Sequence, residues 1–306
     1  MSLNIDFKNR EALTITDYEF LSLFKKPKEK VCFRLIQEEK HIAKKFDCIL
    51  TLDDDLEYPL MQKIFIKYQK QGYGVYFVVN SGGQEKNSIK RINAHFIDMD
   101  FGKVPLIDSG ELIKDSKGKI IYEYRNKEEI EEYKIAFLKK LENFKLIPNV
   151  IVETKNGFHV YWLLDFEKPQ SLDAFTPIQE KLIDYFASFE ERKEHADSSV
   201  KDINRVLRLI NYKHLKDPKD PFTIKCIYLN TDKKYTQEDI ASAVGYNIIE
   251  LVNNTKSTEI KPSAVRAEAS NLQKESHKVH YPSEIQYENL IPFLKQQDLI
   301  SYLGIN

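Results

Sequence analysis

Two aspartates at the end of an apolar segment have the type and spacing to do chemistry. Asp98 and Asp100 alternate with Ile97 and Met99. Because successive residues of a strand point to opposite faces, the two carboxylates share one face. Neighbouring carboxylates repel each other and are costly to bury, and a divalent cation such as Mg²⁺ removes that cost. The spacing therefore predicts either a metal site or two solvent-facing aspartates at the end of a strand.

Lys155 and His159 form the second group of chemically capable residues. They flank an Asn-Gly pair that separates two β-rich segments, 150–154 and 158–164. Asn-Gly between such segments is among the strongest local indications of a β-hairpin. A histidine at the mouth of a hairpin can donate a hydrogen bond to a phosphate oxygen, and the lysine can add a positive charge. The alternative is a half-buried histidine on a sheet face with no ligand.

An acid followed by two arginines forms the third group: Asp197, Arg205 and Arg208. Arginines three residues apart share a face in a helical turn but not in a regular strand, so both serve one triphosphate only if the chain bends between them. A solvated amphipathic helix is the alternative, and Asp202 is the second choice for the acid. Carboxylates that hold metal, with cationic groups that hold a triphosphate, are what phosphoryl transfer from a nucleotide requires.

Periodic segments surround these three groups and must position them. An excursion with weak strands is expected over 102–126, around Gly118. The interleaving of elements favours an α/β or α+β architecture, and the Asn-Gly hairpin makes part of the sheet antiparallel. The sequence predicts helices over 16–26, 56–71, 127–143, 170–187 and 236–244, and strands over 31–36, 47–52, 75–80, 92–101, 150–154, 158–164 and 222–229.

The composition is that of a globular protein with a substantial core. Hydrophobic residues make up 42% of the chain, including 17 Tyr and 18 Phe. Lysines and arginines number 46 against 47 acids, a net charge of -1, whereas a dedicated nucleic-acid coat protein is usually basic. Three cysteines without a Cys-x-x-Cys pair argue against a zinc knuckle and predict reduced thiols. With no predicted signal peptide or membrane span, we expect a cytoplasmic protein without a membrane partner.

The composition changes after Val252, which indicates a domain boundary. Residues 253–281 are rich in Asn, Ser, Thr, Lys and Glu and are predicted to form a linker. Residues 282–306 regain apolar periodicity and are predicted to form a short helical segment, too short to be stable alone. The domain that carries the three groups is therefore expected to span 1–252.

The order and spacing of the three groups resemble the motifs of the archaeo-eukaryotic primase superfamily, in particular the primase-polymerases of plasmids, phages and CRISPR-associated systems. The resemblance covers about 70–230. Two positions depart from the family pattern: a common serine is Gly157 here, and the usual Pro-Gly after the Arg-Leu run is Ile210-Asn211. The matching residues are Phe96-Ile97-Asp98-Met99-Asp100, then Lys155 with Gly157-Phe158-His159, and then Ala196-Asp197 with Arg205 and Arg208.

The resemblance implies an α+β primase-polymerase catalytic domain over 1–252. A mixed sheet like that of an RNA-recognition fold would pack beside an N-terminal α/β module, and a helical C-terminal tail would follow. The loop Asn80–Arg91 would lie near the cleft, where Lys90 and Arg91 could contact template or nucleotide.

The activity that the resemblance implies is that of a template-dependent DNA primase-polymerase, acting in DNA replication on mobile genetic elements. Its partners would be single-stranded DNA, primer, nucleoside triphosphates and, through the C-terminal tail, a helicase or other replication protein. The alternatives are a catalytically degenerate replication-initiation module that binds DNA, and a metal-dependent nuclease. The implied ligands of two Mg²⁺ or Mn²⁺ ions are Asp98, Asp100 and Asp197, and the implied nucleotide-binding residues are Lys155, Gly157, His159, Arg205 and Arg208.

Overall fold

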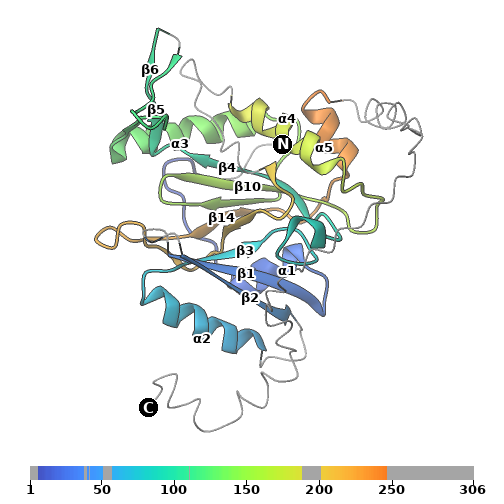
Figure 1. Cartoon of the computed structure of the whole chain (residues 1–306). Coiled ribbons are helices and arrows are strands. Elements are labelled where there is room, and N and C mark those ends of the chain that lie inside the picture. Colours follow the sequence, from blue (N-terminus) through green and yellow to red (C-terminus); the bar gives the residue numbers. More distant parts are fainter. Residues whose placement is uncertain are drawn as a thin grey trace, which may run out of the picture. The chain divides into compact units, whose positions relative to one another are not determined.

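Two four-stranded antiparallel sheets with covering helices, together with three two-stranded sheets, make up the described part of the chain (Figure 1). The computed structural model describes residues 6–37, 40, 42–50, 57–109, 111–187 and 201–246. Asp197, the linker 253–281 and the segment 282–306 lie outside the described residues. None of the described helices is long and apolar enough to cross a lipid bilayer. The five α-helices among the described residues, together with these two sheets, confirm the predicted α+β class.

The first sheet is the core of the N-terminal module. Its strand order is β11-β3-β1-β2, with antiparallel pairing throughout. Helix α2 lies on one side of this sheet (Figure 1), and Thr16 caps α1 with a reciprocal hydrogen-bond pair to Glu19. The elements are α1 (Asp17–Phe24), β1 (Glu29–Gln37), β2 (Ile42–Leu50), α2 (Glu57–Gln69), β3 (Gly74–Val78) and β11 (Val206–Arg208).

The second sheet carries the first two groups of candidate residues. Its strand order is β14-β9-β10-β4, and β9 and β10 form the predicted Asn-Gly hairpin. The strands of this sheet pair antiparallel, and among the described residues the isolated bridge between Leu164 and Tyr235 is the one parallel pairing. The elements are β4 (Ala94–Asp100), α3 (Lys127–Glu142), β9 (Val150–Glu153), β10 (Gly157–Leu163), α4 (Phe175–Ala187), β14 (Lys225–Leu229) and α5 (Gln237–Ala243).

Strand β10 separates two layers of the core. Phe158 stacks on Phe137 of α3, and Trp162 stacks on Phe186 of α4. On the opposite face, Tyr161 meets Phe24 of α1 with ring centroids 5.0 Å apart. Strand β10 therefore divides its side chains between two faces: its even-numbered residues pack under the helices. Its odd-numbered residues face α1 and the first sheet.

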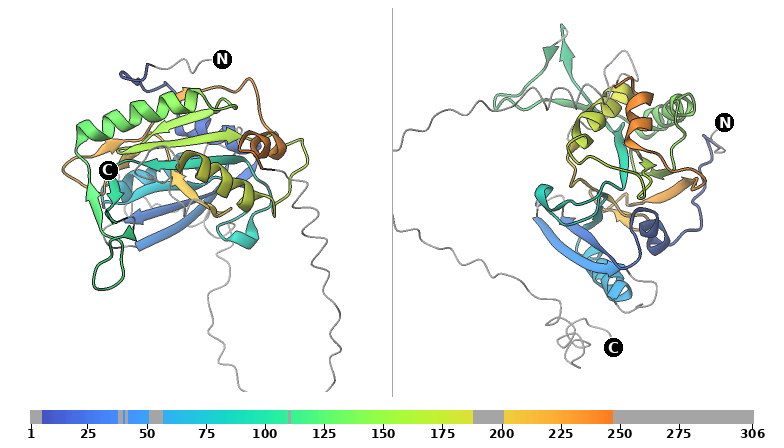
Figure 2. Two further views of the ribbon diagram at one scale, coloured as in Figure 1. Left: turned by 90° about the horizontal axis from the view of Figure 1, so that it is seen from above. Right: turned by 90° about the vertical axis from the view of Figure 1, so that its right-hand side faces the viewer.

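Shorter elements complete the described chain. The excursion 102–126 forms two small hairpins that project away from the second sheet (Figures 1 and 2). A 3₁₀ turn, η1, lies in the loop that follows β3. These elements are η1 (Lys86–Ser88), β5 (Lys103–Pro105), β6 (Ile107–Asp108), β7 (Glu111–Leu112), β8 (Tyr122–Tyr124), β12 (Lys213–His214) and β13 (Phe222–Thr223).

A buried histidine of β4 makes the stability of the fold depend on pH. His95 stacks on Phe175, and its Nδ1 lies 3.0 Å from Oε1 of Gln179. Burial lowers the pKa of His95 from 6.5 to about 4, although the contact with Gln179 opposes the shift. Unfolded chains therefore bind more protons than folded ones between these values, so stability is full above pH 7 and falls as the pH decreases.

We expect the unfolding free energy to fall by about 2 kcal/mol between pH 7 and pH 5 because His95 takes up a proton in the unfolded chain but not in the folded one. Urea unfolding at the two pH values measures the loss. The variant His95→Gln has no titrating group at this position, so its loss over the same interval should be smaller by about that amount. An equal loss in both proteins would contradict the assignment.

Candidate active site

The two aspartates of the first group lie at the end of β4, as their spacing predicts. Asp98 pairs across the sheet with His159, and Asp100 pairs with Gly157. The side chain of Asp98 is 24% exposed, and Asp100 is exposed. Oδ1 of Asp98 lies 3.6 Å from Nε2 of His159. The sheet register therefore brings the first and second groups into direct contact on one face.

His159 is buried and neutral. Burial is the largest cause that lowers its pKa to about 3, followed by the charges of Arg208 and Arg205 and then by His214. A neutral imidazole makes no ion pair with Asp98 and does not compete with a cation for that carboxylate. Nδ1 of His159 is buried and has no hydrogen-bond partner among the described residues. Such a nitrogen is costly to leave unmatched, so it is suited to a bound polar ligand.

The arginines of the third group approach His159 from the first sheet. Arg208 ends β11, pairs with Tyr76 of β3 and lies with its guanidinium 4.7 Å from the centroid of that ring. Arg205 closes a turn before β11, because its N–H donates to the carbonyl of Asp202 at 3.0 Å. The helical alternative for this segment is therefore wrong. Both arginines lie close enough to His159 to lower its pKa.

The turn after the arginines explains one departure from the family pattern. Asn211 has a φ of 68°, in the left-handed region that glycine adopts freely and asparagine tolerates best among other residues. Its side-chain amide donates to the carbonyl of Ile15 at 2.9 Å, which ties the turn to the start of the chain. An asparagine at this position is therefore compatible with a left-handed backbone, the conformation for which glycine is otherwise favoured.

His214 of β12 is a site residue that the sequence reasoning missed. It contributes to the low pKa of His159, which places it near the same face. The chain turns at Asn211 between Arg208 and His214, and this turn returns the histidine toward the site. In the sequence, the one indication of a role at the site is that His214 follows the second arginine by six residues. A single histidine at that distance does not distinguish a site residue from a structural one.

Two other predicted residues have structural partners of their own. Nζ of Lys155 donates to the carbonyl of Asp220 at 2.8 Å and lies 3.4 Å from its carboxylate. Arg91, in the loop after β3, forms an ion pair with Glu29 and lies over the ring of Phe166. Lys90 is exposed. In this state Lys155 and Arg91 hold the fold together.

Gly157 stands where its strand comes closest to β4. A Cβ at this position would lie 1.8 Å from the carbonyl oxygen of Met99 and 3.3 Å from Cα of Asp100. Real Cβ atoms do not approach backbone atoms so closely, so only glycine fits without movement of a strand. The second departure from the family pattern, glycine in place of serine, therefore has a steric cause in this chain.

A buried ionic cluster holds the base of the β9–β10 hairpin. Oε1 of Glu153 accepts hydrogen bonds from Nη2 of Arg10 at 2.8 Å and from Nζ of Lys134 at 2.9 Å. Burial alone would raise the pKa of Glu153, but the two cations outweigh it and the pKa is lowered. Lys134 also donates to the carbonyl of Lys155 at 3.1 Å. The hairpin turn that precedes His159 is thereby fixed to α3.

The described residues supply part of a metal site. Among them, no cluster of three or more His, Cys, Asp or Glu side chains could hold a metal ion. Asp98 and Asp100 offer two carboxylates on one strand face, the donor type that Mg²⁺ and Mn²⁺ prefer. The predicted third ligand, Asp197, lies outside the described residues, and the alternative, Asp202, is exposed. The donor set that is present fits a divalent cation with open positions.

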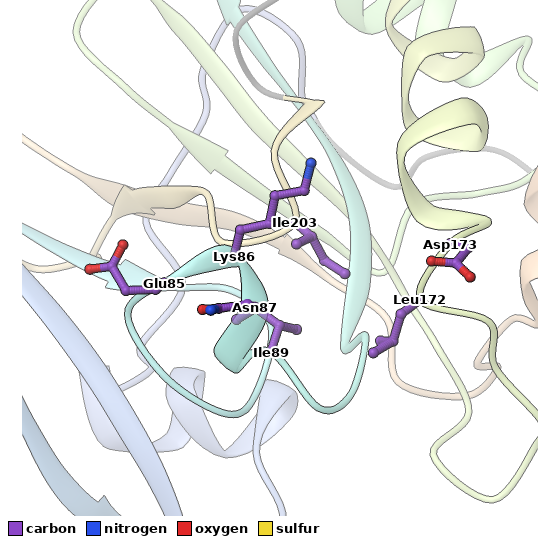
Figure 3. A pocket seen from close by; sticks show the side chains of 7 residues that line it. All are labelled: Glu85, Lys86, Asn87, Ile89, Leu172, Asp173 and Ile203. Carbon is purple, nitrogen blue, oxygen red and sulfur yellow. The ribbon is translucent and has the colours of Figure 1, made fainter. Parts of the chain in front are cut away.

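A pocket of about 680 Å³ lies beside the segment that leads into β11. Figure 3 shows η1 on one side of it and Leu172 and Asp173 on the other, with Ile203 between them. None of the predicted site residues lines this pocket. The pocket therefore does not define the candidate site, which depends on Asp98 and the cationic side chains beside it.

No protein-family model and no curated protein matches this chain. Three solved structures are similar to it. The AEP domain of the cyanophage S-2L primase-polymerase shares 20% identity, with 74% of this chain and 94% of that chain covered and a TM-score of 0.45. The primase RepB′ shares 10% identity, with 79% and 66% covered and a TM-score of 0.44. The catalytic domain of RepB′ with initiator DNA shares 11%, with 76% and 92% covered and a TM-score of 0.42. The first of these structures is the AEP domain of a primase-polymerase, and the other two are structures of a primase.

Proposed function

We propose that this protein is a template-dependent DNA primase-polymerase. It adds nucleotides from nucleoside triphosphates to a 3′-hydroxyl and so synthesises and extends primers on single-stranded DNA. One observation carries the proposal: Asp98 faces a buried, neutral His159, whose pKa is lowered first by burial and then by the charges of Arg208 and Arg205. Carboxylates for a cation and positive charges for a triphosphate lie side by side, and nucleotidyl transfer needs both.

The nucleotide-binding role belongs to His159 and the two arginines. Neutral His159 has one N–H to donate to a phosphate oxygen, and burial keeps the ring in place. Arg205 and Arg208 supply the charge that a triphosphate requires, and stacking on Tyr76 orients the guanidinium of Arg208. Lys155 joins them if it exchanges Asp220 for a phosphate. Gly157 contributes indirectly, because it lets β10 approach β4 and so supports the place of His159 opposite Asp98.

Asp98, Asp100 and Asp197 would hold two Mg²⁺ or Mn²⁺ ions. When bound, such ions activate the attacking hydroxyl and neutralise charge on the leaving pyrophosphate. The hydrogen bond from Gly102 N to Oδ1 of Asp100, 2.9 Å long, orients that carboxylate at the end of β4. Asp98 lies opposite His159, which supports a cation site next to the phosphates that the histidine and arginines would bind.

A priming and extension assay on single-stranded templates tests this function. Ribonucleotides and deoxynucleotides are supplied separately, each with Mg²⁺ or Mn²⁺. We expect products that lengthen only with template, metal and nucleotide together. Shortening of labelled DNA with metal but without nucleotides would instead indicate a nuclease. Metal-dependent nucleotide binding, seen as a thermal shift, without any product would indicate a degenerate replication-initiation module.

A further inference from the structure

The hairpin that follows the aspartate strand exposes aromatic side chains. Strand β5 begins three residues after Asp100 and pairs with β8, which carries Tyr122 and Tyr124. Tyr124 is 75% exposed and Tyr122 is 36% exposed. The hairpin projects from the second sheet (Figures 1 and 2). Exposed rings on a projecting element are accessible to another molecule, so their arrangement decides what they can bind.

The register of this hairpin gathers the tyrosines on one face with a lysine. Lys103 lies opposite Tyr124, and Pro105 lies opposite Tyr122, so these four side chains share a face. Nζ of Lys103 lies 4.5 Å from the centroid of the Tyr122 ring. The side chain of Val104 points to the other face and is buried. The outward face therefore consists of two rings, a proline and a positive charge.

The stem of the hairpin is fixed to the strand that carries the aspartates. Arg125 donates from Nη1 to the carbonyl of Phe101 at 3.0 Å, and its guanidinium lies 3.7 Å from the centroid of Tyr133 in α3. Its backbone N–H donates to the carbonyl of Gly102 at 3.2 Å. Tyr124 precedes Arg125 directly. The chain from Asp100 to Lys103 spans at most about 10 Å, and the step across to Tyr124 adds about 5 Å.

We propose that the Tyr122–Tyr124 face is a stacking platform for single-stranded nucleic acid. Every base has a π-face that stacks on an exposed tyrosine, and the lysine attracts the phosphates between bases. The platform lies close enough to Asp100 to hold a strand that also passes the candidate active site. That this strand is the template rests on the proposed function, whereas the binding itself does not.

Fluorescence anisotropy with labelled oligo(dT) and oligo(U) tests the platform on the full chain. We expect Tyr124→Ala to weaken binding roughly fivefold or more, the effect of one lost stacking partner. Tyr124→Phe keeps the ring and should bind as the unmodified protein does, whereas Tyr124→Leu should resemble Tyr124→Ala. Ile66→Ala is the matched control, because Ile66 is 53% exposed on α2 and should not matter. A difference in affinity between oligo(dT) and oligo(U) shows whether the platform prefers DNA or RNA.

The lysine is tested through the salt dependence of binding. Lys103→Ala should reduce the slope of log affinity against log salt by about 0.7, the share of one phosphate contact on a single strand. Lys63→Ala, an exposed lysine of α2, should leave the slope unchanged.

Four results would overturn the platform: no oligonucleotide binding by the unmodified protein, unchanged binding by Tyr124→Ala, a loss in Tyr124→Phe, or full binding by Tyr124→Leu. The last would show that a flat aromatic ring is not needed, so that bases do not stack on Tyr124. The thermal shift with metal and nucleotide should be the same in Tyr124→Ala, because the nucleotide site lies elsewhere. The two proposals can fail separately. If the unmodified protein makes no product but Tyr124→Ala still weakens oligonucleotide binding, the proposed function is refuted and the platform stands.

Discussion

Asp98→Asn is expected to lower the rate of nucleotide addition by at least roughly 10³-fold, because it removes several kcal/mol of cation-dependent stabilisation from the transition state. The substitution keeps the size and hydrogen-bonding shape of the side chain. His159 opposite it is neutral, so the loss of the carboxylate charge breaks no ion pair with that residue. Single-turnover primer extension, followed with and without Mn²⁺, measures the effect on chemistry.

Urea unfolding provides the control for Asp98→Asn. The midpoint should be close to that of the unmodified protein, since relief of repulsion from Asp100 offsets any lost contact. An inactive variant with an unchanged midpoint assigns the loss to chemistry. Extension at the normal rate by a folded Asp98→Asn protein would refute the metal site and the proposed function together.

The same primer-extension assay decides whether Asp197 or Asp202 is the third metal-binding acid. Asp202 is exposed and its carbonyl closes the turn before β11, so Asp202→Asn should leave that turn and the activity in place. Asp197→Asn should be as inactive as Asp98→Asn. The opposite result would move the third ligand to Asp202 and would shorten the spacing to Arg205 from eight residues to three.

The elements that the sequence predicts well are those whose cause is local. Asn156-Gly157 sets the hairpin because two β-rich segments meet there, and Thr16 sets the start of α1 through its bond with Glu19. The alternation of Phe158 with His159 likewise separates a helix-covered face from one that faces α1. Each of these patterns is complete within a few residues, so tertiary context does not alter it.

The segment around Arg205 shows why other parts could not be predicted. Arginines three residues apart fit a helix as well as a turn, and nothing local decides between them. The segment becomes strand β11 because the edge of β3 pairs with Val206–Arg208, more than 120 residues away along the chain. The contact of Lys155 with Asp220 likewise depends on a loop that lies 65 residues away along the chain. Neither partner is visible in a local pattern.

Gly157→Ser introduces the serine that is common at this position in the primase superfamily. We expect it to lower both the activity and the stability of this protein. Its Cβ would lie 1.8 Å from the carbonyl oxygen of Met99, so β4 or β10 must move. β4 carries both aspartates, and a displacement of about 1 Å in a catalytic group can lower a rate about 10²-fold. Strain of this kind also costs about 1–3 kcal/mol of unfolding free energy. Extension rates and urea midpoints should therefore fall together.

Gly102→Ala is the matched control for Gly157→Ser, because it adds a Cβ in the same region against a side chain instead of a backbone. That Cβ would lie 2.3 Å from Nδ2 and 2.7 Å from Cγ of Asn156, so the side chain of Asn156 must rotate about its Cα–Cβ bond, whereas the three nearest atoms include no backbone. We expect this variant to keep most of its activity and to lose less than about 1 kcal/mol. If Gly157→Ser is active and Gly102→Ala is not, the strands do not approach each other as closely as the geometry requires. The contact between Gly157 and Met99 would then not be what positions Asp98 opposite His159.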